Sequence, residues 1–195
     1  MSDASIPVTG HPDADRLLVE DPLALLIGML LDQQVPMEWA FRGPYTFRER
    51  LGRGDRLDAA AIAALGPEKV EELFRAKPAL HRFPGSMGKR THALCQHLVD
   101  EYGGDAESVW RDAATGEELL ARLKALPGYG EEKAKIFLAI LGKRLGAAPP
   151  GWEEAAAPFS DSTPRSVADI DSPGSLRRVR EWKTEQKRKK KGKAD

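Results

Sequence analysis

The chain has 195 residues, of which 41% are hydrophobic and 31% charged, and this composition excludes a disordered or fibrous protein. Its only cysteine, Cys95, excludes an intramolecular disulfide and any cluster that needs four cysteine ligands. The net charge of zero hides an asymmetry, because residues 174–195 hold ten Lys and Arg against three Asp and Glu, a net +7, so the other residues carry −7.

The first segments predict a flexible lead-in and a buried helix. Residues 1–15 are acidic and lack an apolar signal core, which, with the lone cysteine, predicts a cytoplasmic protein. The stretch "DPLALLIGMLLDQQ" then predicts a helix with Asp21 as its N-cap and Pro22 in the first position. Its apolar run is too short to span a bilayer. Pro36 either ends this helix or opens the next one.

Short amphipathic helices are predicted through the middle of the chain. Their expected ranges are 37–52, 59–65, 67–75 and 86–102, the last closed by two glycines. A further helix opens with Thr115 and Glu118 at the spacing of a capping box. Since β-branched residues are few and no segment alternates with period two, the predicted fold class is all-α.

A "PGYG" turn separates that helix from the next one, "EEKAKIFLAILGKRLG". Gly128 and Gly130 can adopt φ > 0, and they leave backbone N–H groups uncovered by any Cβ. The following helix start has free N–H groups and the positive end of the helix dipole, which favours a phosphate. The alternative is an ordinary turn between two antiparallel helices.

The C-terminal part is predicted to contain a Pro-rich loop over 147–166, a resumed helix and a frayed basic tail over 183–195. Asp171 or Ser172 could cap the helix, with Pro173 in its first turn. Residues 16–182 then form one helical domain. The tail suits a polyanion, and a tail that serves only solubility is the alternative.

Three stretches in this order resemble the helix-hairpin-helix DNA glycosylase (HhH-GPD) superfamily, which contains endonuclease III, the adenine glycosylases and the alkylbase glycosylases. They are "PLALLIGMLLDQQVPMEWAF", "FPGSMGKRTHALCQHLVDEYGGD" and "ALPGYGEEKAKIFLAILG". The resemblance implies two helical lobes, with the hairpin at the mouth of a cleft. It also implies a monomer that binds double-stranded DNA with a damaged or mismatched base and flips that base out of the stack.

The resemblance assigns residues to DNA. Backbone N–H groups at the hairpin hold a phosphate, and Gln34, with Gln33 beside it, fills the gap that the flipped base leaves; a polar helix end is the alternative for this pair. Lys89 and Arg90 could contact phosphates or simply be solvated charges. The candidate DNA-binding residues are Gln33, Gln34, Lys89, Arg90, Gly128, Tyr129, Gly130, Glu132, Lys133, Arg177 and Arg178. A monovalent cation would bind the carbonyl groups of Lys124, Leu126 and Tyr129.

The sequence departs from the family pattern at the lyase lysine. Lyase-competent members carry a lysine two positions after the last hairpin glycine, where this chain has Glu132. Lys133 comes one residue later, about 100° around the helix, so we expect it to point elsewhere. Schiff-base chemistry needs an amine aimed at the sugar. A monofunctional glycosylase is therefore predicted.

The essential aspartate of the family normally follows the hairpin by about twenty residues, where it stabilises positive charge on the sugar or activates water. That window contains no aspartate here. Beyond the loop, Asp171 matches the family step of an apolar residue, an aspartate and a small residue, although a plain helix cap is the alternative. Asp161 and then Glu154 are the next candidates.

The sequence also lacks the cysteine quartet that holds the iron–sulfur cluster of endonuclease III, so we expect no such cofactor. The leading hypothesis is a DNA base-excision protein, monofunctional if active. A DNA-binding module without catalysis and a helical scaffold for a protein partner are the alternatives. The sequence does not define the lesion, because pocket shape selects the base.

Overall fold

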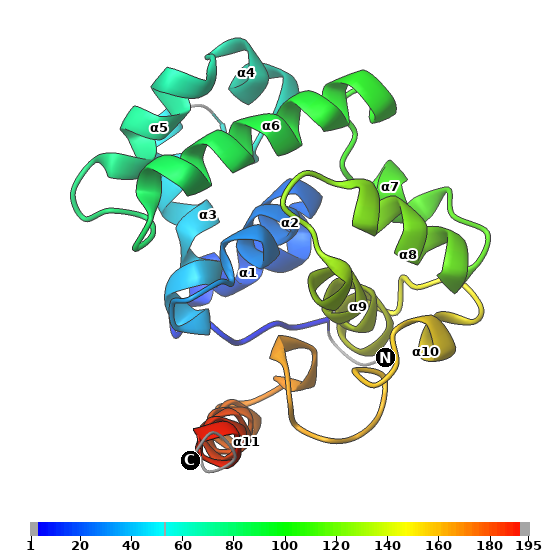
Figure 1. Cartoon of the computed structure of the whole chain (residues 1–195). Helices are drawn as coiled ribbons and strands as arrows, with labels where there is room; N and C mark the ends of the chain where they lie inside the picture. The colour runs from blue at the N-terminus through cyan, green and yellow to red at the C-terminus, as the bar shows by residue number, and fades with distance from the viewer. Residues whose placement is uncertain (1–3, 53, 192–195) are drawn as a thin grey trace.

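The computed structural model describes residues 4–52 and 54–191, and in this part of the chain helices are the only regular secondary structure, which confirms the all-α class (Figure 1). The α-helices are α1 (Pro12–Glu20), α2 (Pro22–Leu31), α3 (Met37–Leu51), α4 (Ala59–Ala64), α5 (Pro67–Arg75), α6 (Pro84–Tyr102), α7 (Ser108–Arg111), α8 (Gly116–Ala125), α9 (Glu131–Ile140), α10 (Trp152–Ala155) and α11 (Pro173–Lys191). A π-helix, η1 (Leu141–Leu145), continues α9, and a 3-10 helix, η2 (Val167–Asp169), precedes α11. None of these helices has the length and apolar character that a membrane span requires.

Helix α2 is the central element of the fold. Every residue from Leu23 to Leu31 is buried, as expected of a helix that is apolar on all sides. The predicted cap is confirmed, because the Asp21 carboxylate accepts hydrogen bonds from the N–H groups of Leu23 (2.9 Å) and Ala24 (3.2 Å). It also accepts one from Leu57 N–H (2.7 Å), which ties the start of α2 to the loop before α4.

The remaining helices form two groups around α2, in agreement with the two predicted lobes. In Figure 1, α3 to α6 lie on one side of α2, and α7 to α10 lie on the other. Helix α6 packs against α4 and α5, while α8 packs against α7, α9 and α10. Helix α2 contacts both α6 and α9, so it joins the two groups.

Two predicted boundaries shift for local reasons. Helix α6 begins at Pro84 rather than Ser86, because proline fits the first turn of a helix. The predicted loop over 147–166 contains the short helix α10. The ring of Trp152 covers Gly142, where an added Cβ would lie 2.5 Å from that ring. The loop is therefore held against η1 by an aromatic contact that only glycine permits.

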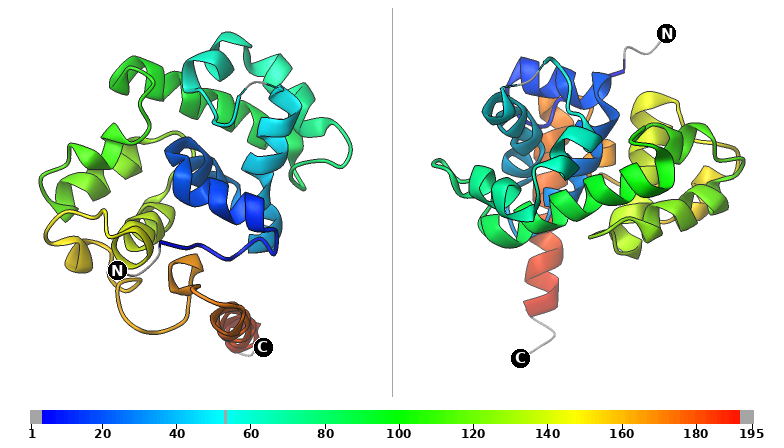
Figure 2. Two further views of the ribbon diagram at one scale, coloured as in Figure 1. Left: turned by 180° about the vertical axis from the view of Figure 1, so that it is seen from behind. Right: turned by 90° about the horizontal axis from the view of Figure 1, so that it is seen from above.

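The predicted frayed tail is wrong for residues 183–191, which continue α11 as one helix. Lysine, arginine, glutamate and glutamine are good helix formers, and a Glu185–Lys189 ion pair (2.8 Å) at the i,i+4 spacing adds support. Arg180 forms an ion pair with Glu38 near the start of α3, while the far end of α11 projects away from the body (Figure 2). Residues 192–195 of the predicted tail lie outside the described residues.

Candidate functional site

The turn between α8 and α9 presents an open helix start. Gly128 has φ +83°, whereas Gly130 has φ −85°, so only Gly128 uses the left-handed region. Gly130 is the N-cap of α9 and supplies no side-chain acceptor to the first N–H groups. A Cβ at Gly130 would meet no atom within 4 Å. These N–H groups at the positive end of α9 are therefore accessible to an anion.

The turn is seated on α2. The Tyr129 hydroxyl donates a hydrogen bond to the Leu26 carbonyl (2.6 Å), and burial raises the pKa of Tyr129 well above its ordinary value. The Tyr129 ring, predicted as a DNA contact, is buried, and the N–H of Tyr129 donates to the Leu126 carbonyl (3.1 Å). At Gly128, an added Cβ would lie 2.3 Å from Leu30 Cδ1. The backbone of the hairpin turn at Gly128 thus packs directly against the Leu30 side chain of α2.

Gly128→Ala is expected to lower the free energy of unfolding by on the order of 1–3 kcal/mol, since alanine disfavours φ +83° and its Cβ would overlap Leu30. DNA affinity should fall with it, because the turn would move. Gly130→Ala is the matched control, as its φ is ordinary and its surroundings are open. Urea unfolding of both variants measures the difference. Equal stability of the two variants would contradict this role of Gly128 in the turn.

The residues after α2 are held in a defined and strained conformation. Gln34 has φ +57° and is the only non-glycine residue of the described chain with a positive φ. Such strain persists where the surroundings enforce it, and it clusters at functional sites. The His81 ring lies 3.1 Å from the Leu31 carbonyl and 3.0 Å from the Gln33 carbonyl, through its Nε2 atom.

The side chains of Gln33 and Gln34 differ in whether they are hydrogen-bonded to other residues. The Gln33 side-chain oxygen accepts from Arg90 Nη1 (3.3 Å) and lies 3.4 Å from Lys133 Nζ. Gln34 is exposed, and its side chain makes no hydrogen bond to the described residues. Gln34 is therefore the glutamine that can reach a ligand, and Gln33 anchors the segment.

Lys133 points at the end of α2. Its ammonium donates a hydrogen bond to the Leu30 carbonyl (2.5 Å), at the negative end of the α2 dipole. Burial lowers the pKa of Lys133 to about 8, which Asp32 opposes and Arg90 reinforces. Glu132, at the position of the family lysine, is exposed in the first turn of α9.

The candidate basic contacts lie on two elements. Arg90, in α6, is exposed, and its Cδ would lie 3.8 Å from a Cβ at Gly128, so it borders the hairpin turn. Lys89, its neighbour, lies 3.4 Å from Glu71 through its ammonium. Arg177 and Arg178 are exposed on α11. The structure therefore brings Arg90 to the turn and places the two arginines on another helix.

The HhH-GPD family model, described as HhH-GPD superfamily base excision DNA repair protein, matches residues 27–194. That range includes the end of α2, the hairpin and α11. The chain belongs to the HhH-GPD superfamily. No curated protein and no solved structure is significantly similar to it. The family match indicates a base excision DNA repair protein, and it implies that the chain acts on DNA.

In this HhH-GPD protein Asp171 is not the helix cap. Ser172 caps α11 instead, because its hydroxyl accepts from Ser175 N–H (3.2 Å). The hydroxyl groups of Ser175 and Ser172 lower the pKa of Asp171, and Arg144 of η1, 3.7 Å away, acts in the same direction. Asp171 is exposed, so it is an ionised carboxylate whose oxygens are accessible.

The other two predicted acids lie on the loop and α10. The Asp161 carboxylate accepts from Thr163 N–H (2.9 Å) and pairs with Arg165, so it is occupied within its own loop. Lys143 joins this loop to η2, since its ammonium donates to the Asp161 carbonyl (2.5 Å) and to Asp169 (2.6 Å). Glu154 is exposed on α10. The three candidates do not form one cluster.

Of the three hairpin carbonyl groups predicted to bind a monovalent cation, two are free of backbone hydrogen bonds from the described residues. Lys124 and Tyr129 carbonyls accept no backbone hydrogen bond from the described residues, whereas the Leu126 carbonyl accepts from Tyr129 N–H. Oxygen donors of this kind suit hard cations. In the part of the chain that the structure describes, no group of three or more His, Cys, Asp or Glu residues could hold a metal ion.

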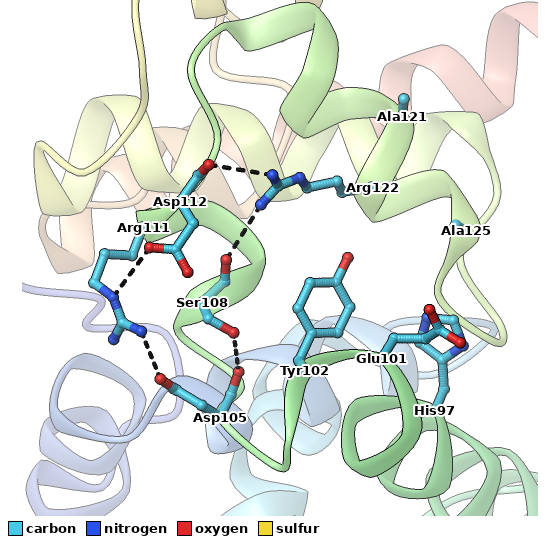
Figure 3. A pocket seen from close by; sticks show the side chains of 10 residues that line it. All are labelled: His97, Glu101, Tyr102, Asp105, Ser108, Arg111, Asp112, Ala121, Arg122 and Ala125. Atoms are coloured by element: carbon cyan, nitrogen blue, oxygen red, sulfur yellow. Dashed lines mark hydrogen bonds and ion pairs between the residues drawn. The ribbon is translucent and has the colours of Figure 1, made fainter.

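A surface depression of about 820 Å³ lies between α6, α7 and α8 (Figure 3). Its two arginines are engaged within the protein: Arg111 pairs with Asp105 (2.6 Å), and Arg122 donates to the carbonyl groups of Ser108 and Asp112. We assign these charges to holding α7 against α8.

Sequence reasoning missed one residue of the site, Asp32. It is the C-cap of α2, is partly buried, and immediately precedes Gln33. Burial raises the pKa of Asp32 despite the nearby charges of Lys183 and Lys133. Its place directly before the two glutamines was the available signal, but only the folded chain brings α9 and α11 to it.

Proposed function

We propose that this protein is a monofunctional DNA N-glycosylase that removes a damaged base from duplex DNA. One observation carries the proposal: the hairpin turn packs on α2 at Leu30, and Lys133 in the first turn of α9 lies 3.4 Å from the side-chain oxygen of Gln33, the residue before the strained, exposed Gln34. A phosphate grip and a probing side chain are thereby fixed relative to each other. Phosphate contacts position a protein on DNA, and a side chain that enters the stack supports base flipping.

In the proposed reaction, groups of this chain first bind a DNA phosphate and then stabilise the charge that develops as the base departs. The N–H groups at Gly130, Glu131 and Glu132 hold one phosphate, and Arg90 borders it. A cation on the Lys124, Leu126 and Tyr129 carbonyl groups would add positive charge beside that phosphate. As the base departs, positive charge develops on the sugar, and the ionised Asp171 stabilises it. Water then completes the hydrolysis.

The monofunctional assignment is supported by Glu132 and Lys133. Glu132 supplies a carboxylate where a lyase needs an amine. The Lys133 amine is bound to the Leu30 carbonyl and to Gln33, so it is engaged in holding α2 and α9 together. We further propose that the protein acts as a monomer. We also propose that it works without an iron–sulfur cluster, since Cys95 is its only cysteine.

A panel of duplexes, each with one damaged or mismatched base, tests the proposal. The purified full chain is incubated with each duplex, and released base is separated from DNA and quantified; binding is measured on the same duplexes. We expect base release from at least one duplex, with the strand left intact. Binding without release from any duplex would overturn the enzyme and favour a lesion-recognition module. Absence of binding would favour the helical scaffold.

Borohydride reduction in the presence of abasic DNA is expected to trap no covalent complex, because the Lys133 ammonium is directed at Leu30. Its pKa of about 8 makes the test stringent, since some neutral amine is present at neutral pH. Glu132→Lys is the matched positive variant, which places an amine one helical position earlier and should gain a trapped complex. An adduct of the parent protein that maps to Lys133 would refute the monofunctional assignment.

A further inference from the structure

Asp32 occupies the junction of three elements of the site. It ends α2, and its own N–H donates to the Met29 carbonyl (3.2 Å), which fixes its backbone. Gln33, the next residue, is anchored by Arg90 and Lys133, and Gln34 after it is strained and exposed. Asp32 is therefore held rigidly beside the side chain that we assign to the gap in the duplex.

The Asp32 carboxyl group is unusual in having charged neighbours but no partner. It forms no hydrogen bond and no ion pair with any described residue, although it is partly buried. The charges that act on it are Lys133 and Glu132 of α9 and Lys183 of α11. Arg90 and His81, which face Lys133 and Gln33, complete the charged and titratable groups around this junction. A partly buried, unpaired carboxyl group can serve an incoming ligand.

The surroundings of Asp32 and of Asp171 shift the pKa values of these two carboxyl groups in opposite directions. Burial raises the pKa of Asp32, whereas serine hydroxyl groups lower that of Asp171. A DNA phosphate on the nearby start of α9 would favour the protonated form of Asp32 further, because it adds negative charge. Pairs of acids with separated pKa values divide the roles of proton donor and charged stabiliser.

We propose that Asp32 is the general acid of this enzyme and donates a proton to the departing base. The inference rests on the proposed glycosylase function. It also sets a substrate class: neutral damaged bases, which leave poorly without a proton, rather than bases that already carry a positive charge.

The step balances as follows. The bond from C1′ to the base nitrogen breaks, and its electron pair goes to the base, which takes the proton of the Asp32 carboxyl group. The sugar cation then accepts water at C1′, and the released proton returns to the Asp32 carboxylate. The products are the free base and an abasic site, with no oxidant or further reactant.

Asp32→Asn tests the inference, with Asp32→Glu as the conservative variant. Single-turnover base release is measured across about pH 5 to pH 8 from the neutral base that the panel shows is released fastest, and from a duplex with cationic 7-methylguanine. For the neutral base, Asp32→Asn should slow release by about 100-fold or more, and Asp32→Glu should restore part of the rate. Cationic 7-methylguanine, if released, should be affected by less than about threefold, because it needs no proton.

The pH profile is the second readout. The parent rate for the neutral base should fall as pH rises through the raised pKa of Asp32, because the active form is protonated, and the asparagine variant should lose this dependence. Equal slowing of both bases, no slowing of the neutral base, or release of cationic bases alone by the parent would overturn the role of Asp32 and leave the glycosylase standing. Release of no base by the parent would overturn the glycosylase itself. Melting temperature and duplex affinity of each variant verify that folding and binding persist.

Discussion

Asp171→Asn is expected to slow base release by about 100- to 1000-fold while DNA affinity stays unchanged, because a fixed anion stabilises charge that develops only in the transition state. Asp171 is exposed, ionised and positioned by the capped start of α11. Asparagine keeps the shape of the side chain and removes its charge. Single-turnover base release and duplex binding are measured side by side.

Asp161→Asn and Glu154→Gln are the matched comparisons. Asp161 is occupied by Arg165 and Thr163 N–H, and Glu154 lies exposed on α10, so we expect neither change to reduce base release strongly. Loss of activity in one of them, with Asp171→Asn active, would move the assignment to that residue. If all three variants release base like the parent, the carboxylate assignment is wrong.

Deletion of residues 183–195 is expected to weaken DNA binding about tenfold or more at low salt. The slope of its salt dependence should also flatten, by about 0.9 for each phosphate that the shortened protein no longer neutralises. The segment holds seven Lys and Arg against two Asp and Glu. In the structure Lys187, Arg188, Lys189 and Lys190 are exposed on α11, whose far end projects away from the body (Figure 2). Affinity measured at several salt concentrations gives the slope.

A charge-neutralised full chain controls for the loss of helix. Glutamine at positions 187, 188, 189 and 190 removes four positive charges, keeps helix propensity and leaves Lys183 and the Arg180–Glu38 pair in place. It should reproduce most of the change in slope. An unchanged slope in both proteins would return the basic helix to a role in solubility.

Local signals in the sequence predicted the helices well where the determinants are close along the chain. The Asp21 and Pro22 start of α2 is confirmed because a side-chain cap and its N–H partners are within three residues of each other. The "PGYG" turn is confirmed for the same reason, since the positive φ that the turn requires falls on a glycine, Gly128. The end of α11 was missed, because a charge run resembles a solvated tail until its helix propensity is weighed.

The site itself depends on packing between distant parts of the chain. Lys133 meets Leu30 and Gln33 about one hundred residues away, and no periodicity encodes that contact. Only this packing shows that Gln33 is anchored and Gln34 free, and that Tyr129 is buried. The same holds for Asp32, on which charges of α9 and α11 act, far from it in the sequence.

The sequence by itself determined the all-α class, the capped start of α2, the glycine turn and the family to which the chain belongs, because caps, glycine conformations and motif order are local properties of the chain. Only the tertiary structure decided which carboxyl groups are paired, which are free, and how burial and neighbouring charges shift their pKa values. Those properties depend on desolvation and on distances between elements that the fold alone brings together.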